Sequence, residues 1–296
     1  MTDFAIVIPT VGRDSLQRLL AELDGSSGPK PSAVLVADDR ADPTPPLQLS
    51  ANLPVTVLRS GGRGPAAARN VGWRAARSPW ICFLDDDVVP QPNWLAALAD
   101  DLAVAEADEA VGSQGVIEVP RVGGRRATDD ERRTQRLSEA KWITADMAYR
   151  RSALVAVGGF DERFPRAYRE DSDLALRIVL CGNKISQGSR RCTHPIARAT
   201  WMSSVRAQIG NRDNALMRRK HGMVWRTAIG EGRGRMPAHA LTSAVAITAL
   251  VALMTRRWRV ARAAARLWAA LTVEFAAWRF WAGPHTPVEA ARMLLT

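Results

Sequence analysis

The 296-residue sequence is poor in cysteine, and this scarcity excludes a fold held together by disulfide bonds. Cys82, Cys181 and Cys192 are odd in number and form no Cys-x-x-Cys pair, so we expect reduced, structural thiols. The sequence also lacks the pattern of a signal peptide, because the apolar run at residues 4–9 is too short and follows Asp3. We therefore expect the catalytic part of the protein to be cytoplasmic.

The composition is that of a globular protein with an uneven distribution of charge. Hydrophobic residues make up 47% of the chain and charged residues 24%, which excludes a disordered chain and allows one large domain with an appendage. Residues 1–118 contain 16 acidic and 9 basic side chains, whereas residues 119–296 contain 14 acidic and 32 basic ones. The acidic first part argues against a nucleic-acid partner, and the basic second part is suited to phosphate groups or anionic lipid.

Short apolar runs alternate with helical patterns along the first hundred residues. This alternation predicts an α/β fold with a mostly parallel sheet that is covered by helices on both faces. In such sheets ligands bind beyond the carboxyl ends of the strands, and Asp38 and Asp39 follow one of these ends. The expected strands are residues 4–9, 33–37, 54–59 and 80–84, and the expected helices are residues 14–23 and 66–76.

The pattern is less regular beyond residue 112. The charge-dense stretch 121–136 predicts a loop or a frayed helix, and residues 170–180 predict a helix with Leu174 on its inner side. Residues 236–255 then carry no formal charge and are followed by five arginines between positions 256 and 266. We divide the chain into a catalytic domain, 1–205, whose nucleotide-binding part ends near 118 and whose acceptor part covers about 119–205, and a basic, apolar helical tail, 206–296.

Three adjacent aspartates end the strand expected at residues 80–84. Carboxylates at a strand end can converge on a divalent cation, which prefers hard oxygen ligands. Three neighbouring acids repel one another, so their proximity favours a bound cation. A solvated acidic turn is the alternative interpretation. The residues concerned are Asp85, Asp86 and Asp87.

Several motifs in a fixed order make the chain resemble family 2 glycosyltransferases over about residues 4–200. The resemblance implies a GT-A fold and an inverting transfer of a sugar from a nucleoside diphosphate, helped by Mg²⁺ or Mn²⁺. The motifs are Ile8-Pro9-Thr10, Val36-Ala37-Asp38-Asp39, Gly64-Pro65-Ala66-Ala67-Ala68-Arg69-Asn70, Phe83-Leu84-Asp85-Asp86-Asp87, Gly158-Gly159-Phe160-Asp161 and Glu170-Asp171-Ser172-Asp173-Leu174.

The same resemblance implies which residues bind the donor nucleotide. Asp39 matches the residue that contacts the nucleobase, and Arg69 matches an arginine that supports the nucleotide site and pairs with Asp85. Arg40 replaces the glycine that commonly follows the two acids, which leaves the base open among UDP, GDP and dTDP. The other residues of the expected nucleotide pocket are Pro9, Thr10, Arg13 and Asp86.

The metal and the catalytic base are also implied by the resemblance. Asp87, the last acid of the DxD motif, matches the metal ligand on the diphosphate, with Asp85 beside it. Asp171 matches the base that takes the proton of the acceptor hydroxyl, with Glu170 as its neighbour. Both acids open an expected helix, whose dipole favours their ionised forms, and they could also serve only as helix-terminal acids.

Three further residues are weaker candidates. His194 lies in a region from which GT-A enzymes supply another metal or diphosphate ligand, and neutral imidazole suits Mn²⁺ better than Mg²⁺. A hydrogen-bonded structural histidine is the alternative. Trp142 and Asp146 match positions that contact the donor or acceptor sugar, although a tryptophan of the core is an equal interpretation of Trp142.

The tail leaves three alternatives open. As a helix, residues 236–255 would be about 30 Å long, enough to span a bilayer core, but arginines flank them on both sides. The first alternative is a membrane-associated helical pair with Trp258, Trp268, Trp278 and Trp281 at headgroup depth. The others are a spanning helix and a soluble helical appendage.

The first of these alternatives predicts a glycosyltransferase held at the cytoplasmic face of the cell membrane, with a lipid-linked or cell-envelope glycan precursor as acceptor. A nucleotidyltransferase is a rival prediction, but residues 9–13 lack the glycine-rich loop that would hold a triphosphate. A sugar-nucleotide-binding membrane adaptor without catalytic activity is the second rival. The sequence predicts no oligomeric state.

Overall fold

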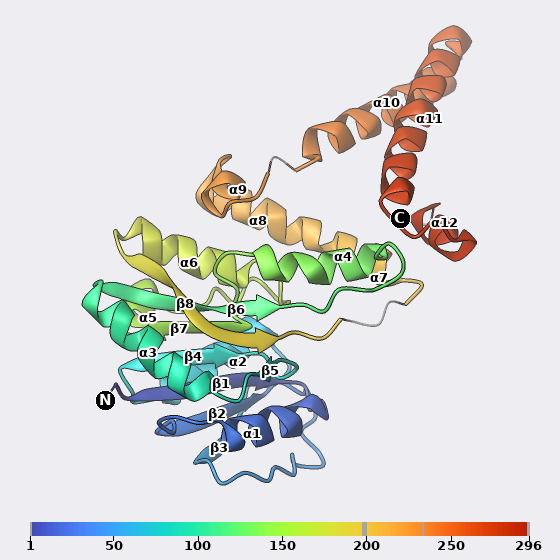
Figure 1. The fold of residues 1–296 in the computed structure, drawn as a ribbon. Coiled ribbons are helices and arrows are strands. Elements are labelled where there is room, and N and C mark those ends of the chain that lie inside the picture. The colour runs from blue at the N-terminus through green and yellow to red at the C-terminus, as the bar shows by residue number, and fades with distance from the viewer. Residues whose placement is uncertain (1, 197–199, 233, 295–296) are drawn as a thin grey trace. The chain divides into compact units, whose positions relative to one another are not determined.

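The computed structural model describes residues 2–196, 200–232 and 234–294 and separates into two compact units (Figure 1). The first, which we call the sheet unit, comprises Met1–Pro120, Gln135–Ile196 and Gly210–Gly222. The second, the helical unit, comprises Arg121–Thr134, Ala197–Ile209 and Met223–Thr296. Residues 210–222 thus belong with the sheet and residues 121–134 with the C-terminal helices, whereas the sequence suggested one border at residue 205.

An eight-stranded mixed sheet forms the centre of the sheet unit. In chain order its strands are β1 (Phe4–Thr10), β2 (Ala33–Asp38), β3 (Val55–Arg59), β4 (Trp80–Leu84), β5 (Val89–Pro90), β6 (Ala110–Glu118), β7 (Asp146–Arg150) and β8 (Lys184–Thr193). Their order across the sheet is β3-β2-β1-β4-β7-β6-β8-β5. The first four strands in this order run parallel, as predicted, and β7 then pairs antiparallel with both β4 and β6.

Helices flank the sheet, which confirms the α/β fold class. They are α1 (Ser15–Gly25), α2 (Pro65–Ala75), α3 (Trp94–Ala107), the 3₁₀ helix η1 (Arg136–Glu139), α5 (Arg151–Val157), α6 (Glu170–Leu180) and α8 (Asn211–His221). The side chains of β1 alternate between two cores, because successive residues of a strand point to opposite faces. One core joins Ile6 to α1 and α3, and the other joins Val7 to α2 and α6.

The register of the parallel strands brings their carboxyl ends together. Thr10 of β1 pairs with Asp38 of β2, and Val7 pairs with Phe83 of β4, two residues before Asp85. Every residue of β1 and β4 is buried, because β1 has neighbours on both edges and both faces of the sheet are covered. The acidic strand ends that the sequence predicted therefore lie at one edge of the sheet.

The helical unit contains a short helix from the middle of the chain and a C-terminal helical hairpin. Its elements are α4 (Asp129–Gln135), whose last residue is counted with the sheet unit, α7 (Ser203–Ala207), the 3₁₀ helix η2 (Gln208–Gly210), α9 (Trp225–Ala228), α10 (Met236–Met254), α11 (Trp258–Trp281) and α12 (Pro287–Leu294). Helices α10 and α11 lie side by side (Figure 1). Helix α10 is the one described helix that is long and apolar enough to cross a membrane, with a mean hydropathy of 1.7, and 6% of that stretch is buried.

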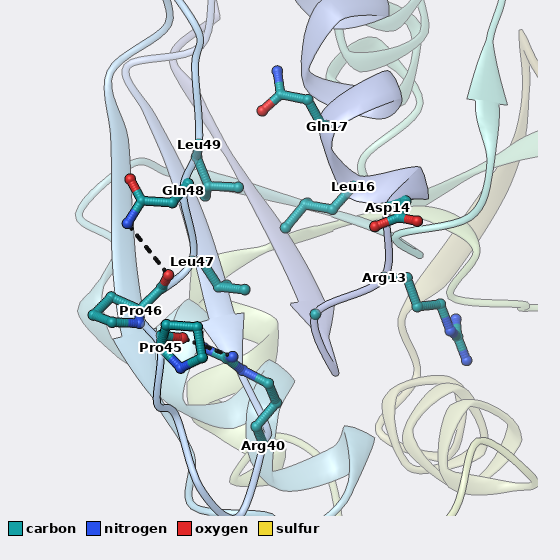
Figure 2. A pocket seen from close by; sticks show the side chains of 11 residues that line it. Arg13, Asp14, Leu16, Gln17, Arg40, Pro45, Pro46, Leu47, Gln48 and Leu49 are labelled. Atoms are coloured by element: carbon teal, nitrogen blue, oxygen red, sulfur yellow. Dashed lines mark hydrogen bonds between the residues drawn. The ribbon is translucent and has the colours of Figure 1, made fainter.

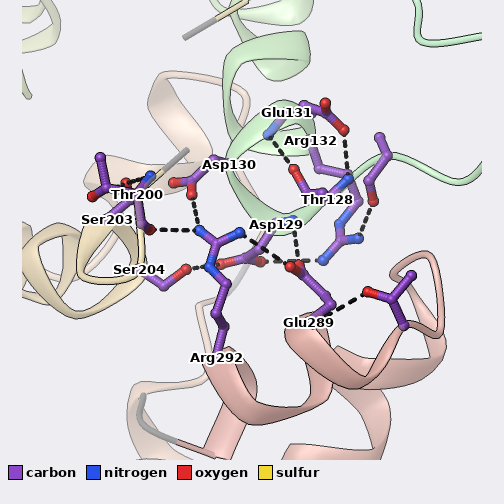
Figure 3. A network of polar contacts seen from close by, with 12 residues as sticks. Thr128, Asp129, Asp130, Glu131, Arg132, Thr200, Ser203, Ser204, Glu289 and Arg292 are labelled. Atoms are coloured by element: carbon purple, nitrogen blue, oxygen red, sulfur yellow. Dashed lines mark hydrogen bonds and ion pairs between the residues drawn. The ribbon is translucent and has the colours of Figure 1, made fainter. Parts of the chain in front are cut away.

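Ion pairs tie α4 to the last two helices of the chain, and Figure 3 shows the contacts with α12. Arg292 of α12 donates to Asp130 at 2.5 Å, and Arg279 of α11 donates to Asp129 at 2.9 Å. Both arginines are almost fully buried, and the backbone N–H of Asp129 also donates to Glu289 at 3.0 Å. Residues 129–135, expected as a loop or frayed helix, are thus a helix because long-range ion pairs hold them.

Candidate active site

A pocket of about 570 Å³ opens at the carboxyl ends of β1, β2 and β4. The loop after β1 forms one side, and the turn before α2, at residues 62–65, forms another. The other lining residues are the three aspartates after β4, which we call the floor, residues 165–167, which we call the wall, and His194. Many of the donor-binding residues predicted from the resemblance are therefore neighbours in space.

The three aspartates of the floor have different partners. Asp86 is 3% exposed, and it accepts hydrogen bonds from Thr10 Oγ1 at 2.6 Å and from Arg13 at 2.7 Å. Asp87 lies 3.3 Å from the same guanidinium and 3.7 Å from His194 Nε2. Burial raises the pKa of Asp86, and the hydrogen bonds from Thr10 and Arg13 offset only part of that rise. Asp86 therefore organises the floor, and Asp87 faces His194.

Arg69 connects the floor to the start of α6. Its side chain is 2% exposed and pairs with Asp85 at 2.7 Å and with Glu170 at 2.8 Å, so the predicted pairing with Asp85 is confirmed. Burial disfavours the charged guanidinium, but the two carboxylates outweigh this effect and raise the pKa of Arg69. Arg69 is therefore a permanent buried cation between the end of β4 and Glu170, the first residue of α6.

The first two acids of α6 differ in exposure, because Glu170 is buried and Asp171 is half-buried. Burial is the main cause that raises the pKa of Glu170 and that of Asp171, and the charge of Asp171 adds to the rise at Glu170. Asp171 accepts hydrogen bonds from the backbone N–H of Ser172 at 2.6 Å and from its hydroxyl. Among the described residues, Glu170 Oε2 and the hydroxyl of Tyr149 are buried without a hydrogen-bond partner. Such an environment favours proton transfer to a carboxylate.

Asp39 lines the pocket and also organises one of its loops. Its carboxylate accepts hydrogen bonds from Ser60 Oγ at 2.7 Å and from the backbone N–H groups of Arg63 at 3.0 Å and Gly64 at 2.9 Å. Gly64 has a positive φ of 96°, a conformation that glycine adopts readily. Asp39 thus holds the turn before α2 in place, a role that the sequence analysis missed.

Arg40, which departs from the family pattern, turns to a second cavity of about 260 Å³ (Figure 2). Its guanidinium pairs with Asp38 at 2.7 Å and donates to the carbonyl oxygen of Pro45 at 2.9 Å. The hydrogen bonds from Arg40 are the main cause that lowers the pKa of Asp38. Arg40 therefore lines this second cavity and does not line the 570 Å³ pocket.

Of the predicted site residues, nine line the pocket, whereas Glu170, Asp171, Trp142 and Asp146 do not. The pocket is lined by Pro9, Thr10, Arg13, Asp39, Arg69, Asp85, Asp86, Asp87 and His194, and Glu170 joins it through Arg69.

Asp146 and Trp142, predicted to contact a sugar, do not line the pocket. Asp146 is 0% exposed and pairs with Arg190 at 2.7 Å, while its other oxygen accepts a hydrogen bond from Trp94 Nε1 at 2.7 Å. Trp142 packs against the core that contains α2 and α6. The structure gives both residues roles in packing. The pocket wall at residues 165–167 was missed, because nothing in its sequence spacing signals a site.

Asp87 and His194 fit a divalent cation better than the other acids do. No group of three or more metal-ligating side chains comes together within the part of the chain that the structure describes. Asp85 is engaged by Arg69, and Asp86 by Thr10 and Arg13. Asp87 Oδ1 and His194 Nε2 are 3.7 Å apart, so both would be close enough to hold one cation.

Comparison with known proteins shows relatives that match 62% of the chain. The chain is 32% identical over 196 residues to a pre-mycofactocin glycosyltransferase of Mycobacterium tuberculosis, covering 62% of this chain and 40% of that protein. It is 28% identical over 195 residues to the succinoglycan biosynthesis protein ExoO of Rhizobium meliloti, covering 62% of this chain and 56% of that protein. The chain thus matches about half of the length of these curated relatives.

Among solved structures, the chain is similar to S. aureus TarS 1–349 in complex with UDP-GlcNAc. The TM-score is 0.47 at 21% identity, covering 69% of this chain and 61% of that one. This likeness is too distant to bear on the site. Residues 5–162 match the model described as glycosyl transferase family 2, which is more than half of the chain. The chain therefore belongs to glycosyl transferase family 2, and the predicted family is confirmed.

Proposed function

We propose that the chain transfers a sugar from a nucleoside-diphosphate sugar to the hydroxyl of an acceptor, with inversion at the anomeric carbon. The observation that carries this proposal is the chain of contacts from Asp85 through the buried Arg69 to Glu170. It links the strand-end acids of the nucleotide pocket to the acid pair that opens α6. A site that only bound a nucleotide would not need an acid pair with raised pKa values beside the pocket.

The site residues have three separate roles in the proposed reaction: binding the nucleotide, holding the cation and accepting the proton. Asp39, Thr10 and Arg13 line the pocket. Asp39 and Thr10 would contact the nucleoside, and Arg13 would contact the diphosphate. Asp87 and His194 would hold Mn²⁺ or Mg²⁺, whose charge offsets the negative charge that develops on the leaving diphosphate. Asp171 takes the proton of the attacking hydroxyl, which typically contributes about 10²–10⁴ in rate. One displacement with one base inverts the anomeric centre.

Replacing Asp171 by asparagine tests the proposal. We expect the variant to keep its affinity for the donor nucleotide and to lose about 10²–10⁴ in turnover, because the amide cannot accept the proton. The measurement is release of the nucleoside diphosphate, with transfer of the sugar to the acceptor, from UDP-, GDP- and dTDP-sugars in the presence of a polyprenyl phosphate or a glycan acceptor. Nucleotide binding with no turnover in the wild type, unchanged in Asp171→Asn, would favour a sugar-nucleotide-binding adaptor.

The helical hairpin supports a place at the cytoplasmic face of a membrane, with a lipid-linked or cell-envelope glycan as acceptor. Large apolar side chains of α10 and α11 are exposed, among them Leu250, Trp258 and Trp278. Arg256 and Arg257 lie exposed at the turn between the two helices. Apolar side chains and arginines on one helical pair are typical of a segment that lies in the lipid interface.

Vesicle binding tests this part of the proposal. Each arginine near an anionic surface contributes about 1 kcal/mol, so Arg256→Gln/Arg257→Gln should bind phosphatidylglycerol vesicles about 30-fold more weakly. Arg18→Gln/Arg77→Gln, with two exposed arginines of the sheet unit replaced, is the matched control. Equal binding by both variants, or none by the wild type, would contradict membrane association through the hairpin.

A further inference from the structure

Residues 165–167 form a wall of the nucleotide pocket whose position depends on other parts of the sheet unit. The wall touches the turn before α2, since a Cβ atom on Gly64 would lie 2.5 Å from the carbonyl oxygen of Pro165. Arg166 also lines the pocket, and its side chain is 34% exposed. A shift of this segment would therefore change the pocket itself.

A buried acid on α8 holds the side chain of Arg166. Arg166 Nη2 donates to Asp213 Oδ2 at 2.6 Å, and the carboxylate of Asp213 is 1% exposed. A carboxylate in such a place needs a charged partner, because burial alone would strongly disfavour its ionised form. The pair thus ties the guanidinium of a residue that lines the pocket to a fixed point of the fold. Guanidinium groups in fixed orientations are well suited to phosphate oxygens.

Helix α8 is itself anchored at both of its ends to the segment that carries the proposed base. Near its start, Asn214 Oδ1 accepts a hydrogen bond from Arg169 Nε at 3.0 Å. At its end, Lys220 and His221 both contact Asp173, which is 0% exposed. Arg169 has a positive φ of 79°, an uncommon conformation for a residue with a side chain. These contacts bracket Asp171 and fix α8 as a rigid support.

We propose that Arg166 binds the phosphate groups of the donor nucleotide and that Asp213 is a positioning residue, which acts by orienting Arg166. This inference rests on the proposed function and adds to it a cationic side chain from residues 165–167, which line the same pocket as the DxD motif. Both partners lie beyond residues 5–162, the part that matches the family model. Residues 210–222 then contribute to nucleotide binding, because Asp213 within them orients Arg166.

A double-mutant cycle on nucleotide affinity tests the proposal. UDP, GDP and dTDP are titrated, each with Mn²⁺, into the wild-type chain, Asp213→Asn, Arg166→Gln and the double variant. We expect each single variant to bind its nucleotide about tenfold to a hundredfold more weakly, and the double variant to be no weaker than Arg166→Gln. Arg218→Gln, an exposed charge on the same helix, is the matched control and should stay within about twofold.

Arg166→Lys is the control for the case in which the variants without the ion pair do not fold. Lysine keeps a positive partner for Asp213, so this variant should fold, and its affinity should lie between those of the wild type and Arg166→Gln. A lower melting temperature with unchanged affinity in Asp213→Asn and both Arg166 variants would overturn the inference and leave the proposed function standing. No binding of any nucleotide to the wild type would instead overturn the proposed function, and the inference with it.

Discussion

Replacing Glu170 by glutamine asks whether the buried carboxyl beside the proposed base carries a proton. Two influences oppose each other at this residue. Arg69 donates to Oε1 at 2.8 Å and favours the ionised form, whereas burial and the neighbouring Asp171 raise the pKa of Glu170 to about 8. Oε2 has no hydrogen-bond partner among the described residues, which also favours the neutral form. Glutamine has the shape of the protonated acid and cannot ionise.

The expected effect on stability follows from the sign of the shift. The folded state holds a proton on Glu170 up to about pH 8, whereas the unfolded chain releases it near its ordinary pKa of about 4.3. The folded state binds more protons in this window, so stability falls as the pH rises, by about 1.4 kcal/mol per pH unit from this group. Between pH 5.5 and 7.5 the loss is about 3 kcal/mol, or about 6–12 °C in melting temperature.

The assay is thermal unfolding of the wild type and Glu170→Gln across this pH range. Glu170→Gln cannot ionise and so lacks this loss of stability. The melting temperature of the variant should therefore increase relative to that of the wild type as the pH rises. Glu118→Gln, at an exposed position, is the control and should follow the wild type. A difference between Glu170→Gln and wild type that stays constant with pH would refute the reasoning and show that Glu170 is ionised beside Arg69.

Two further predictions concern the framework of the site. Arg190→Ala leaves the carboxylate of Asp146 buried without its ion pair, so it should destabilise the protein by about 3–5 kcal/mol in thermal unfolding. Arg191→Ala, which removes an exposed pair, should cost at most about 1 kcal/mol, and equal losses would contradict the assignment. Gly64→Ala should weaken nucleotide binding and stability more than Gly61→Ala, because both glycines have positive φ but only the first would meet a carbonyl oxygen, at 2.5 Å. Equal effects in thermal shift would argue that the wall does not touch this turn.

The parts of the fold that were predicted are those with a local signal. The strand at residues 80–84 is an unbroken apolar run because both of its faces are covered, and the acids after it mark the edge where ligands bind. Its parallel pairing with β1 follows from the alternation of strands and helices. The pairing of Arg69 with Asp85 came from the family resemblance, and the short separation along the chain kept both residues at one edge.

The parts that were missed depend on contacts between distant residues. Asp146 matched a sugar-contact position, yet Arg190, 44 residues away, holds it inside the fold. Arg166 and Asp213 are 47 residues apart, and neither spacing nor hydrophobic pattern marks them as partners. The basic second part of the chain was interpreted as suited to phosphate groups or anionic lipid, but Lys220 within it binds the buried Asp173. Charged side chains carry no periodic signal of burial, so only the tertiary structure identifies these pairs.

The most direct test of the central claim is the binding of nucleotides to this pocket through Asp87. Melting temperatures of the wild type and Asp87→Ala would be measured with UDP, GDP, CDP and dTDP, with and without Mn²⁺. A ligand at about 100 times its Kd adds about 2.7 kcal/mol to the stability of the folded state, or about 5–10 °C. The account predicts a Mn²⁺-dependent rise with one nucleotide that Asp87→Ala abolishes. No rise with any nucleotide, or the same rise in Asp87→Ala, would contradict it.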